Sequence, residues 1–530
     1  MILLTTSSGK WTPLCERVCA FLDADLLELN LDGQTVHGYR SPDSPSLWLR
    51  DHSDMLRIGR YLHADVKSAV DAFVAQQARN GRVFDFVMTT PLSGSTEREN
   101  WEKWVRVPVE ADVEYRLVKA AYLAWQATGD ADWLRATLPA LDRALSYTLT
   151  HPWRWDAEHG LVKRAYTIDT WDFDYTAGRA DWLNFQITDQ TYWGLFHGDN
   201  SGVYEAAQLL ARMYRELGEQ PEAERWVEIG DGLRQRANVL LFNGRFYTHF
   251  YKLTPVTIPG CNEAEQLSLS NPMAINRGLA THEIAVAILQ EYQKRARTTE
   301  AFAEWFGIDP PFPDGVFGDP KLKGGAYING GIFPLVGGEL ARAAFEHGFE
   351  TYGVQTLETY RRLIADSGAS YLWYFPDGTP CSVETSTSPE ASPTDGWGSS
   401  AMLYALLEGL AGVQDRSHSF RRVRLAPRWV AAGEEYARVQ VSYADSGVTF
   451  GYEFRHLKNQ HRIELLLEGA SEAEVELHLL VPPGREIAQV AWDGKEITFQ
   501  RNNVENSLYL NATNWLKSGK ARIEVRLASE

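Results

Sequence analysis

The chain has little of several features that would mark a special class of protein. It holds four cysteines in 530 residues, Cys15, Cys19, Cys261 and Cys381, which is too few for a disulfide framework. Cys15 and Cys19 stand four residues apart, unlike the ligands of a CxxC metal site. No apolar run approaches the roughly 20 residues of a membrane span, and the first residues lack the pattern of a signal peptide. These absences predict a cytoplasmic protein.

Positive charge is also scarce, with 52 Lys and Arg against 70 Asp and Glu and a formal net charge of −18. Nucleic acids and anionic membranes both select clustered cations, so we expect neither as a partner. By contrast, 44% of the residues are hydrophobic, which provides for a large core. The 18 tryptophans point modestly to carbohydrate, because indole rings stack on the flat C–H faces of sugars; the alternative is burial in helix packing.

Amphipathic helices dominate the first four-fifths of the chain. The apolar spacing predicts helix hairpins, because short polar turns such as Gly129-Asp130 and Gly218-Glu219-Gln220 separate the periodic runs. The expected helices include one near Cys15, Tyr61–Arg79, Glu110–Thr128, Ala131–Thr150, Val203–Leu217, Pro221–Leu241, Leu279–Arg297, Glu339–His347, Val354–Ala365, Ser399–Leu410 and one near Gln186–Phe196. Long loops between hairpins are uncommon unless functional. Helix pairs with such loops recurring on one side predict a toroid whose loops converge on a pocket.

The sequence pattern changes after Ala411. Apolar and polar residues now alternate within short segments, and turn-forming residues separate these segments. The expected strands are Arg421–Leu425, Tyr436–Tyr443, Val448–Arg455, Gln460–Leu467, Glu474–Leu480, Ile487–Trp492, Ser507–Leu510 and Ala521–Leu527. Many short strands of this kind are typical of a β-sandwich. The sequence therefore predicts a helical domain over 1–415 and a β-sandwich over 416–530. The first forty residues are expected to add a helix and a strand pair to the helical body.

Two acidic segments rich in Trp and small residues carry the chemistry expected of the chain. In Asp169-Thr170-Trp171-Asp172-Phe173-Asp174-Tyr175, Trp171 and Phe173 flank Asp172. Apolar neighbours raise a carboxyl pKa, as a general acid requires. Glu384 stands among small polar residues, a hydrated setting in which a carboxylate can activate water; Glu390 is the alternative base. Asp169 and Asp174 lack a nearby His or a regular calcium loop, so no metal is expected.

Three further segments supply candidate sugar contacts. Trp48 precedes the adjacent Arg50 and Asp51, a donor fork beside an acceptor, which suits vicinal hydroxyls; a helix-capping ion pair is the alternative. The glycine-rich run after Tyr327 and Asn329 lets backbone approach a ligand and fits neither GxGxxG nor GxxxxGK, so no nucleotide is expected. Trp397 follows Asp395-Gly396 at a helix start and is placed at the pocket floor.

These motifs resemble those of inverting glycoside hydrolases with an (α/α)6 toroid: trehalases, family 63 α-glucosidases and mannosylglycerate hydrolases, glucoamylases and family 78 α-L-rhamnosidases. The Trp48–Asp51 segment looks like their substrate-binding loop, and Asp169–Asp172 looks like their acid-bearing loop. Tyr327–Pro334 is similar to a Tyr-x-Asn-Gly-Gly-x-x-Pro segment, and Glu384 matches the base that precedes a Gly-Trp helix start. The chain lacks the Gly-rich run of trehalases and the Glu-Asn-Tyr-Asn-Pro of family 63.

The resemblance implies a mainly α fold, an (α/α)6 toroid of helix hairpins, with a C-terminal antiparallel β-sandwich. It implies an exo-acting hydrolase of a small oligosaccharide or glycoside, with Asp172 as acid, Glu384 as base and no cofactor. A glycoside phosphorylase or a sugar epimerase on the same toroid is one alternative; His52 and His197 are the candidate histidines for epimerisation. A non-catalytic carbohydrate-binding protein is another.

Overall fold

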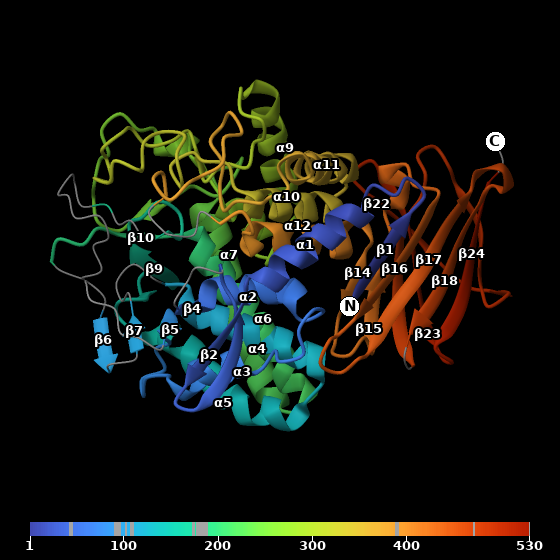
Figure 1. The fold of residues 1–530 in the computed structure, drawn as a ribbon, viewed down its shortest axis with the longest axis horizontal. Helices are drawn as coiled ribbons and strands as arrows, with labels where there is room; N and C mark the ends of the chain where they lie inside the picture. The colour runs from blue at the N-terminus through green and yellow to red at the C-terminus, as the bar shows by residue number, and fades with distance from the viewer. Residues whose placement is uncertain are drawn as a thin grey trace.

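A computed structural model describes residues 1–41, 46–88, 97–100, 103–105, 111–171, 175, 189–386, 392–469 and 472–528, the backbone alone in 97–100 and 103–105. The chain divides into a helical part and a C-terminal part of packed sheets, which stand side by side (Figure 1). Among the described residues, none of the helices combines the length and the apolar character needed to cross a membrane.

Six helices form a closed inner ring, because each packs against the next and the last returns to the first. In ring order they are α2 (Leu49–Gly59), α4 (Val113–Thr128), α6 (His197–Glu216), α8 (Ser270–Asn276), α10 (Pro334–Glu346) and α12 (Gly396–Tyr404), which continues as a π-helical turn over Ala405–Leu410. Six more helices lie outside, each against an inner one: α1 (Thr12–Ala24), α3 (Ser68–Ala75), α5 (Ala131–Thr150), α7 (Gln220–Leu241), α9 (His282–Thr298) and α11 (Glu350–Ser367). This arrangement confirms the predicted toroid.

Local signals explain where the hairpins turn. Gly129 ends α4 with a positive φ of 69°, a conformation that glycine adopts without strain. The carboxylate of Asp130 then accepts a hydrogen bond from the Trp133 backbone N–H and caps α5. Pro221 lies in the first turn of α7, where its missing N–H costs nothing. The predicted bounds of α5 and α7 are therefore close to those observed.

Two helix predictions are wrong. The segment expected to be helical near Gln186–Phe196 contains strand β10 (Trp193–Leu195), which is held by pairing with the strands on both sides; residues 186–188 are not described. The segment Trp48–His52 was expected before a helix beginning near Tyr61. Instead α2 begins at Leu49, and every one of its residues is buried. The polar side of this helix, which includes Arg50, Asp54 and Arg57, is buried against other parts of the chain and does not face solvent, so its charged residues were not recognised as part of a helix.

Two sheets make up the C-terminal part. The seven-stranded sheet has the order β1-β16-β17-β18-β24-β20-β21, and the five-stranded sheet has the order β14-β15-β19-β23-β22. Their bounds are β1 (Ile2–Thr6), β14 (Val413–Asp415), β15 (Arg422–Leu425), β16 (Tyr436–Ser442), β17 (Thr449–Leu457), β18 (Arg462–Gly469), β19 (Ala473–Leu480), β20 (Ile487–Trp492), β21 (Lys495–Glu496), β22 (Gln500–Val504), β23 (Ser507–Leu516) and β24 (Lys520–Leu527). All pairs are antiparallel except β15 with β19, which is parallel.

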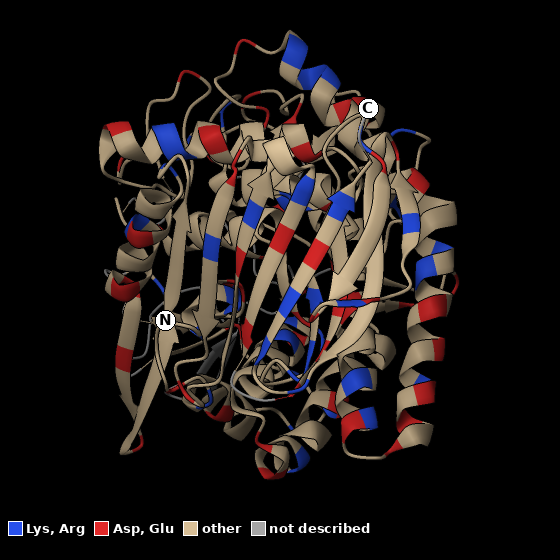
Figure 2. Ribbon diagram, turned by 90° about the vertical axis from the view of Figure 1, so that its right-hand side faces the viewer, with Lys and Arg blue, Asp and Glu red and all other residues tan. Residues whose placement is uncertain are grey.

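The seven-stranded sheet explains the alternating pattern of the sequence. Charged residues recur along its strands (Figure 2). On one face, ion pairs join Arg462 to Glu464 and Glu464 to Arg522. The other face is apolar and buried, with Ile463, Leu465 and others. The chain's first strand, β1, joins this sheet beside β16, with Ile2 opposite Val441. The amino-terminal residues therefore contribute to both parts of the molecule.

Small sheets lie beside the ring. The expected helix and strand pair of the first forty residues are α1 and the hairpin β2 (Leu26–Leu31) with β3 (Gln34–Tyr39). The remaining strands are β4 (Ser46–Trp48), β5 (Phe86–Met88), β6 (Glu97–Asn100), β7 (Lys103–Val105), β8 (Trp155–Asp156), β9 (Leu161–Ala165), β10, β11 (Tyr251–Lys252), β12 (Leu267–Ser268) and β13 (Ile308–Asp309).

Candidate active site

Contacts join the beginnings of the inner helices at one end of the ring. Arg50 in the first turn of α2 binds Asp112, the residue before α4. Asp169 accepts hydrogen bonds from the backbone N–H and the hydroxyl of Ser270, where α8 begins. Helix beginnings carry partial positive charge, so carboxylates are favourable there. This end of the ring collects the segments singled out in the sequence.

An aromatic cluster closes the centre of this end; we define it as Trp171, Tyr327, Phe333, Trp373 and Trp397. Trp171 stacks on Trp397, with ring centroids 5.5 Å apart and an interplanar angle of 17°. Trp171 also meets Tyr327 at 5.8 Å and Phe333 at 5.4 Å, edge to face. Trp373 reaches Tyr327 at 5.9 Å. The structure thus brings together three predicted sugar contacts, Trp171, Tyr327 and Trp397, from separate parts of the chain.

Asp54 anchors the cluster from the α2 side. Its Oδ2 accepts a hydrogen bond of 2.9 Å from the indole N–H of Trp397 and another from Arg116. Burial alone would raise the pKa of Asp54, but Arg116, Lys119 and Arg57 outweigh it and hold the pKa well below its usual value. Asp54 is therefore a fixed negative charge that orients Trp397.

The Trp48–Asp51 segment is bound to other parts of the protein. Arg50 donates two hydrogen bonds of 2.9 Å to the two oxygens of Asp112, in a bidentate pair. Asp51 pairs with Arg40, and both side chains are buried. Trp48 is half-buried and stacks on Phe86 at 4.6 Å. Arg50 and Asp51 are thus held in separate ion pairs with other parts of the chain, and no described side chain caps the start of α2; their contact with substrate stays a prediction.

Asn329 has a structural role that its sequence context did not reveal. Its carbonyl accepts a 2.7 Å hydrogen bond from the Phe312 N–H, and its amide donates to the carbonyls of Phe312 and Leu322 at 2.9 and 2.8 Å. The side chain is 1% exposed. Its hydrogen-bonding groups thus hold the loop that carries Tyr327, which itself has a positive φ of 46°. Asn329 therefore fixes the position of the Tyr327 loop from the protein interior.

Glu384, the predicted base, is exposed in a turn that begins next to Trp373. The Cys381 backbone N–H donates a 3.1 Å hydrogen bond to the Trp373 carbonyl, which fixes the start of this turn beside the aromatic cluster. A hydrogen bond from Ser382 lowers the pKa of Glu384, so its carboxylate is ionised at neutral pH. Asp172 and Glu390 lie outside the described residues. The division of labour between Asp172 and Glu384 stays a prediction.

A pair of buried acids beside the cluster was not foreseen. Asp395 caps α12 through the Gly398 N–H at 3.0 Å. Burial raises its pKa to about 7, with Asp51 adding to the rise. Burial raises the pKa of Asp25 to about 9, and the charge of Asp395 adds to it. Thr394 donates a hydrogen bond of 3.2 Å to Asp25. Between about pH 4 and pH 7 both carboxyls therefore keep protons in the folded protein that they would lose in the unfolded chain.

This pair predicts a stability that falls as pH rises. Between about pH 4 and pH 7 the native state binds more protons than the unfolded state through both groups, and up to about pH 9 through Asp25. The free energy of unfolding should fall by up to ~1.4 kcal/mol per pH unit for each group. Asp25→Asn should flatten the slope between pH 7 and pH 9, as followed by urea denaturation. An unchanged slope in this variant contradicts the assignment.

The candidate histidines of the epimerase alternative are held in the protein interior. His52 accepts a hydrogen bond from the Tyr39 N–H through Nδ1, and His197 contacts the Thr248 carbonyl at 3.1 Å. Burial lowers the pKa of each to about 4, so both are neutral at pH 7. Within the described ranges, no group of three or more His, Cys, Asp or Glu side chains is arranged to hold a metal ion.

Comparisons with solved structures identify the fold. The chain is similar to a GH78 family rhamnosidase of Bacillus sp. GL1, with a TM-score of 0.59, 15% identity and coverage of 90% of this chain and 42% of that one. It is similar to α-L-rhamnosidase from Dictyoglumus thermophilum, with a TM-score of 0.62, 11% identity and coverage of 99% and 50%. For Streptomyces avermitilis α-L-rhamnosidase complexed with L-rhamnose, the TM-score is 0.58, the identity 14% and the coverage 99% and 42%.

These similarities confirm the resemblance to (α/α)6-toroid glycoside hydrolases at the level of the fold. The chain spans half or less of the length of the solved structures named above. No family model matches the sequence, and no curated protein matches it. At 11–15% identity the shared fold does not carry over a substrate or a set of catalytic residues.

Proposed function

We propose that the chain is an inverting, exo-acting glycoside hydrolase that removes a terminal sugar from a small oligosaccharide or glycoside. The observation that carries the proposal is the aromatic cluster, which unites Trp171, Tyr327 and Trp397 at the loop end of a toroid. The fold is shared with glycoside hydrolases. Trp171 adjoins Asp172 in sequence, and the turn of Glu384 is tied to Trp373. Both candidate carboxylates therefore belong to segments attached to the cluster.

In the proposed reaction Asp172 donates a proton to the glycosidic oxygen as the bond from that oxygen to the anomeric carbon breaks. Glu384 takes a proton from a water molecule, whose oxygen bonds to the anomeric carbon from the opposite face. Inversion requires the two carboxyl groups to stand roughly 6.5–9.5 Å apart, which leaves room for the water. The ionised state of Glu384 at neutral pH suits a base. The cluster would provide the apolar floor beneath the sugar ring.

An array of α- and β-glycosides, including rhamnosides, tests the proposal. Purified protein is expected to release free sugar from at least one of them in phosphate-free buffer, at a rate that inorganic phosphate does not change. Hydrolysis without phosphate excludes a phosphorylase, in which phosphate replaces water as the nucleophile. Release of a sugar 1-phosphate, with no free sugar unless phosphate is present, would contradict the proposal. The measurement is product analysis by chromatography with and without phosphate.

A further inference from the structure

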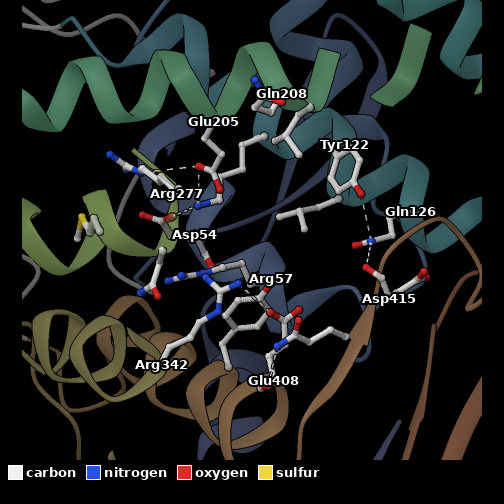
Figure 3. A pocket seen from close by; sticks show the side chains of 18 of the residues that line it. Asp54, Arg57, Tyr122, Gln126, Glu205, Gln208, Arg277, Arg342, Glu408 and Asp415 are labelled. Carbon is white, nitrogen blue, oxygen red and sulfur yellow. Dashed lines mark hydrogen bonds and ion pairs between the residues drawn. The ribbon is translucent and has the colours of Figure 1, made fainter. Parts of the chain in front are cut away.

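A polar cavity lies on the axis of the ring, lined by residues of all six inner helices (Figure 3). It is a cavity of ≈ 340 Å³ lined by the later turns of the inner helices, for example Arg57 of α2, Gln126 of α4 and Arg342 of α10. Trp397 and Phe333, in contrast, stand where α12 and α10 begin. The cavity therefore occupies the opposite end of the toroid from the candidate active site, with Asp54 at their boundary.

Most charged side chains around the cavity neutralise one another. Four carboxylates of the lining pair with four cations: Asp54 with Lys119 at 3.4 Å, Glu205 with Arg277 at 3.7 Å, Glu408 with Arg342 at 3.0 Å, and Glu339 with Arg57. Figure 3 shows Arg277, Glu205 and Asp54 together on the left of the cavity, and Tyr122, Gln126 and Asp415 on the right. The remaining charged lining residues are Asp415, Arg212 and Arg416.

Asp415 does not neutralise the two arginines. Its carboxylate accepts hydrogen bonds from the backbone N–H groups of Ser417 and Phe420, at 2.9 and 2.8 Å, and from the Tyr443 hydroxyl at 3.0 Å. Burial raises its pKa, which weakens its negative charge. In the part of the chain that the structure describes, neither Arg212 nor Arg416 has a carboxylate within the 4.0 Å of an ion pair.

The two arginines lie near each other at an opening. Tyr122, Arg212 and Arg416 line both the cavity and a groove of ≈ 840 Å³ between α4, α6 and the five-stranded sheet, so the two spaces adjoin at these side chains. Desolvation lowers the pKa of Arg416; the charges of Arg424 and Arg212 lower it further, and the more distant carboxylates of Glu346 and Glu408 partly oppose them. Both side chains expose surface here, so a solute in the groove can reach them.

We propose that Arg212 and Arg416 form a binding site for a small phosphate-bearing anion that enters through the groove. Two guanidinium groups, neither of them in an ion pair with a described carboxylate, match a dianion in charge, and each presents a planar fork that binds phosphate oxygens in pairs. Tyr122 adds a hydroxyl at the same opening. Six arginines and four glutamates line the groove, so it keeps a net positive charge in a chain of net charge −18. The proposal does not depend on the reaction at the other end of the ring.

Isothermal titration calorimetry on the full-length protein tests the site. The probes are inorganic phosphate and a hexose 6-phosphate, with chloride at matched ionic strength and the free hexose as controls. We expect the phosphate-bearing probes to bind the unaltered protein, and Arg212→Gln or Arg416→Gln to weaken binding at least about tenfold, since each removes a charge-assisted bidentate contact. Arg421→Gln is the matched control, because this groove arginine is already paired with Glu216 at 3.9 Å and does not line the cavity, so its loss should leave the affinity unchanged.

The outcomes separate the sources of the anion and the alternative role of the arginines. Tighter binding of the hexose phosphate supports an organic phosphate, and equal binding supports the free ion. Binding that is unchanged in the Arg212→Gln/Arg416→Gln double variant, or equal for chloride, overturns the proposal. Thermal unfolding adds a second readout: phosphate should raise the unfolding temperature of the unaltered protein and not that of Arg416→Gln, because an anion bound to the folded state stabilises it. An unfolding temperature of the unaltered protein that phosphate does not change contradicts the site.

Discussion

Asp172→Asn and Glu384→Gln are each expected to lower turnover roughly 10²- to 10⁴-fold while leaving the fold intact. Each substitution keeps the shape of the side chain and removes its ability to exchange a proton. Glu384 is exposed in a turn, so its replacement leaves the packing undisturbed. Initial rates on a hydrolysed glycoside from the array measure the effect, and circular dichroism checks the fold. Near-normal rates in both variants would show that the assignment is wrong.

The leaving group distinguishes the acid from the base. A nitrophenyl glycoside needs little protonation of its leaving oxygen, so Asp172→Asn should lose much less activity on it than on a disaccharide. Glu384→Gln should lose the same factor on both, because activation of water is required in either case. Glu390→Gln is the matched control for the second acid of the same segment. If Glu390→Gln shows the large loss and Glu384→Gln does not, the base is Glu390.

Arg50→Ala is expected to lower the free energy of unfolding by about 3 kcal/mol. The substitution leaves the carboxylate of Asp112, which is 0% exposed, without its bidentate partner. A buried charge that loses its partner typically costs 3–5 kcal/mol, and Arg116, 3.6 Å from Asp112, keeps the loss near the lower limit. Chemical denaturation monitored by Trp fluorescence gives the value.

Two controls separate this effect from a general loss of charge. Arg135→Ala removes an exposed arginine of α5, 62% exposed, and should change stability by less than about 0.5 kcal/mol. The double substitution Arg50→Met/Asp112→Leu removes both charges and should recover most of the loss, because no unpaired charge remains. A loss in the double variant as large as in Arg50→Ala would contradict the role given to the ion pair.

Several helices and strands with one buried face could be predicted from the sequence with small errors in their bounds, although the helix predicted over Tyr61–Arg79 is formed only by Ser68–Ala75. α5 and α7 follow the apolar spacing between a capping Asp130 and an early Pro221. The strands of the C-terminal sheets follow the period of two, because one face packs and the other meets water. α2 could not be predicted, because its charged residues are inside the ring and pair with partners on other helices. Periodicity carries no information about such partners.

Only part of the candidate site could be predicted, because local sequence patterns do not state which distant segments of the chain are in contact. The meeting of Trp171 and Trp397 follows from placing two loops at one end of a toroid. Neighbours in sequence do not reveal that Arg50 binds Asp112 or that Asn329 binds the Phe312 backbone. The raised pKa of Asp395 depends on burial, which the sequence does not state. The cavity of Arg212 and Arg416 arises only when six helices and a sheet close around it.

The anomer of the first product tests the central claim most directly. A hydrolysed glycoside of known configuration is followed by ¹H NMR within the first minutes, before the released sugar mutarotates. Inversion predicts that the anomeric proton signal of the opposite configuration rises first and later decays to equilibrium. Initial appearance of the retained anomer would contradict the account, because it requires a covalent intermediate and two carboxyl groups only about 5–5.5 Å apart.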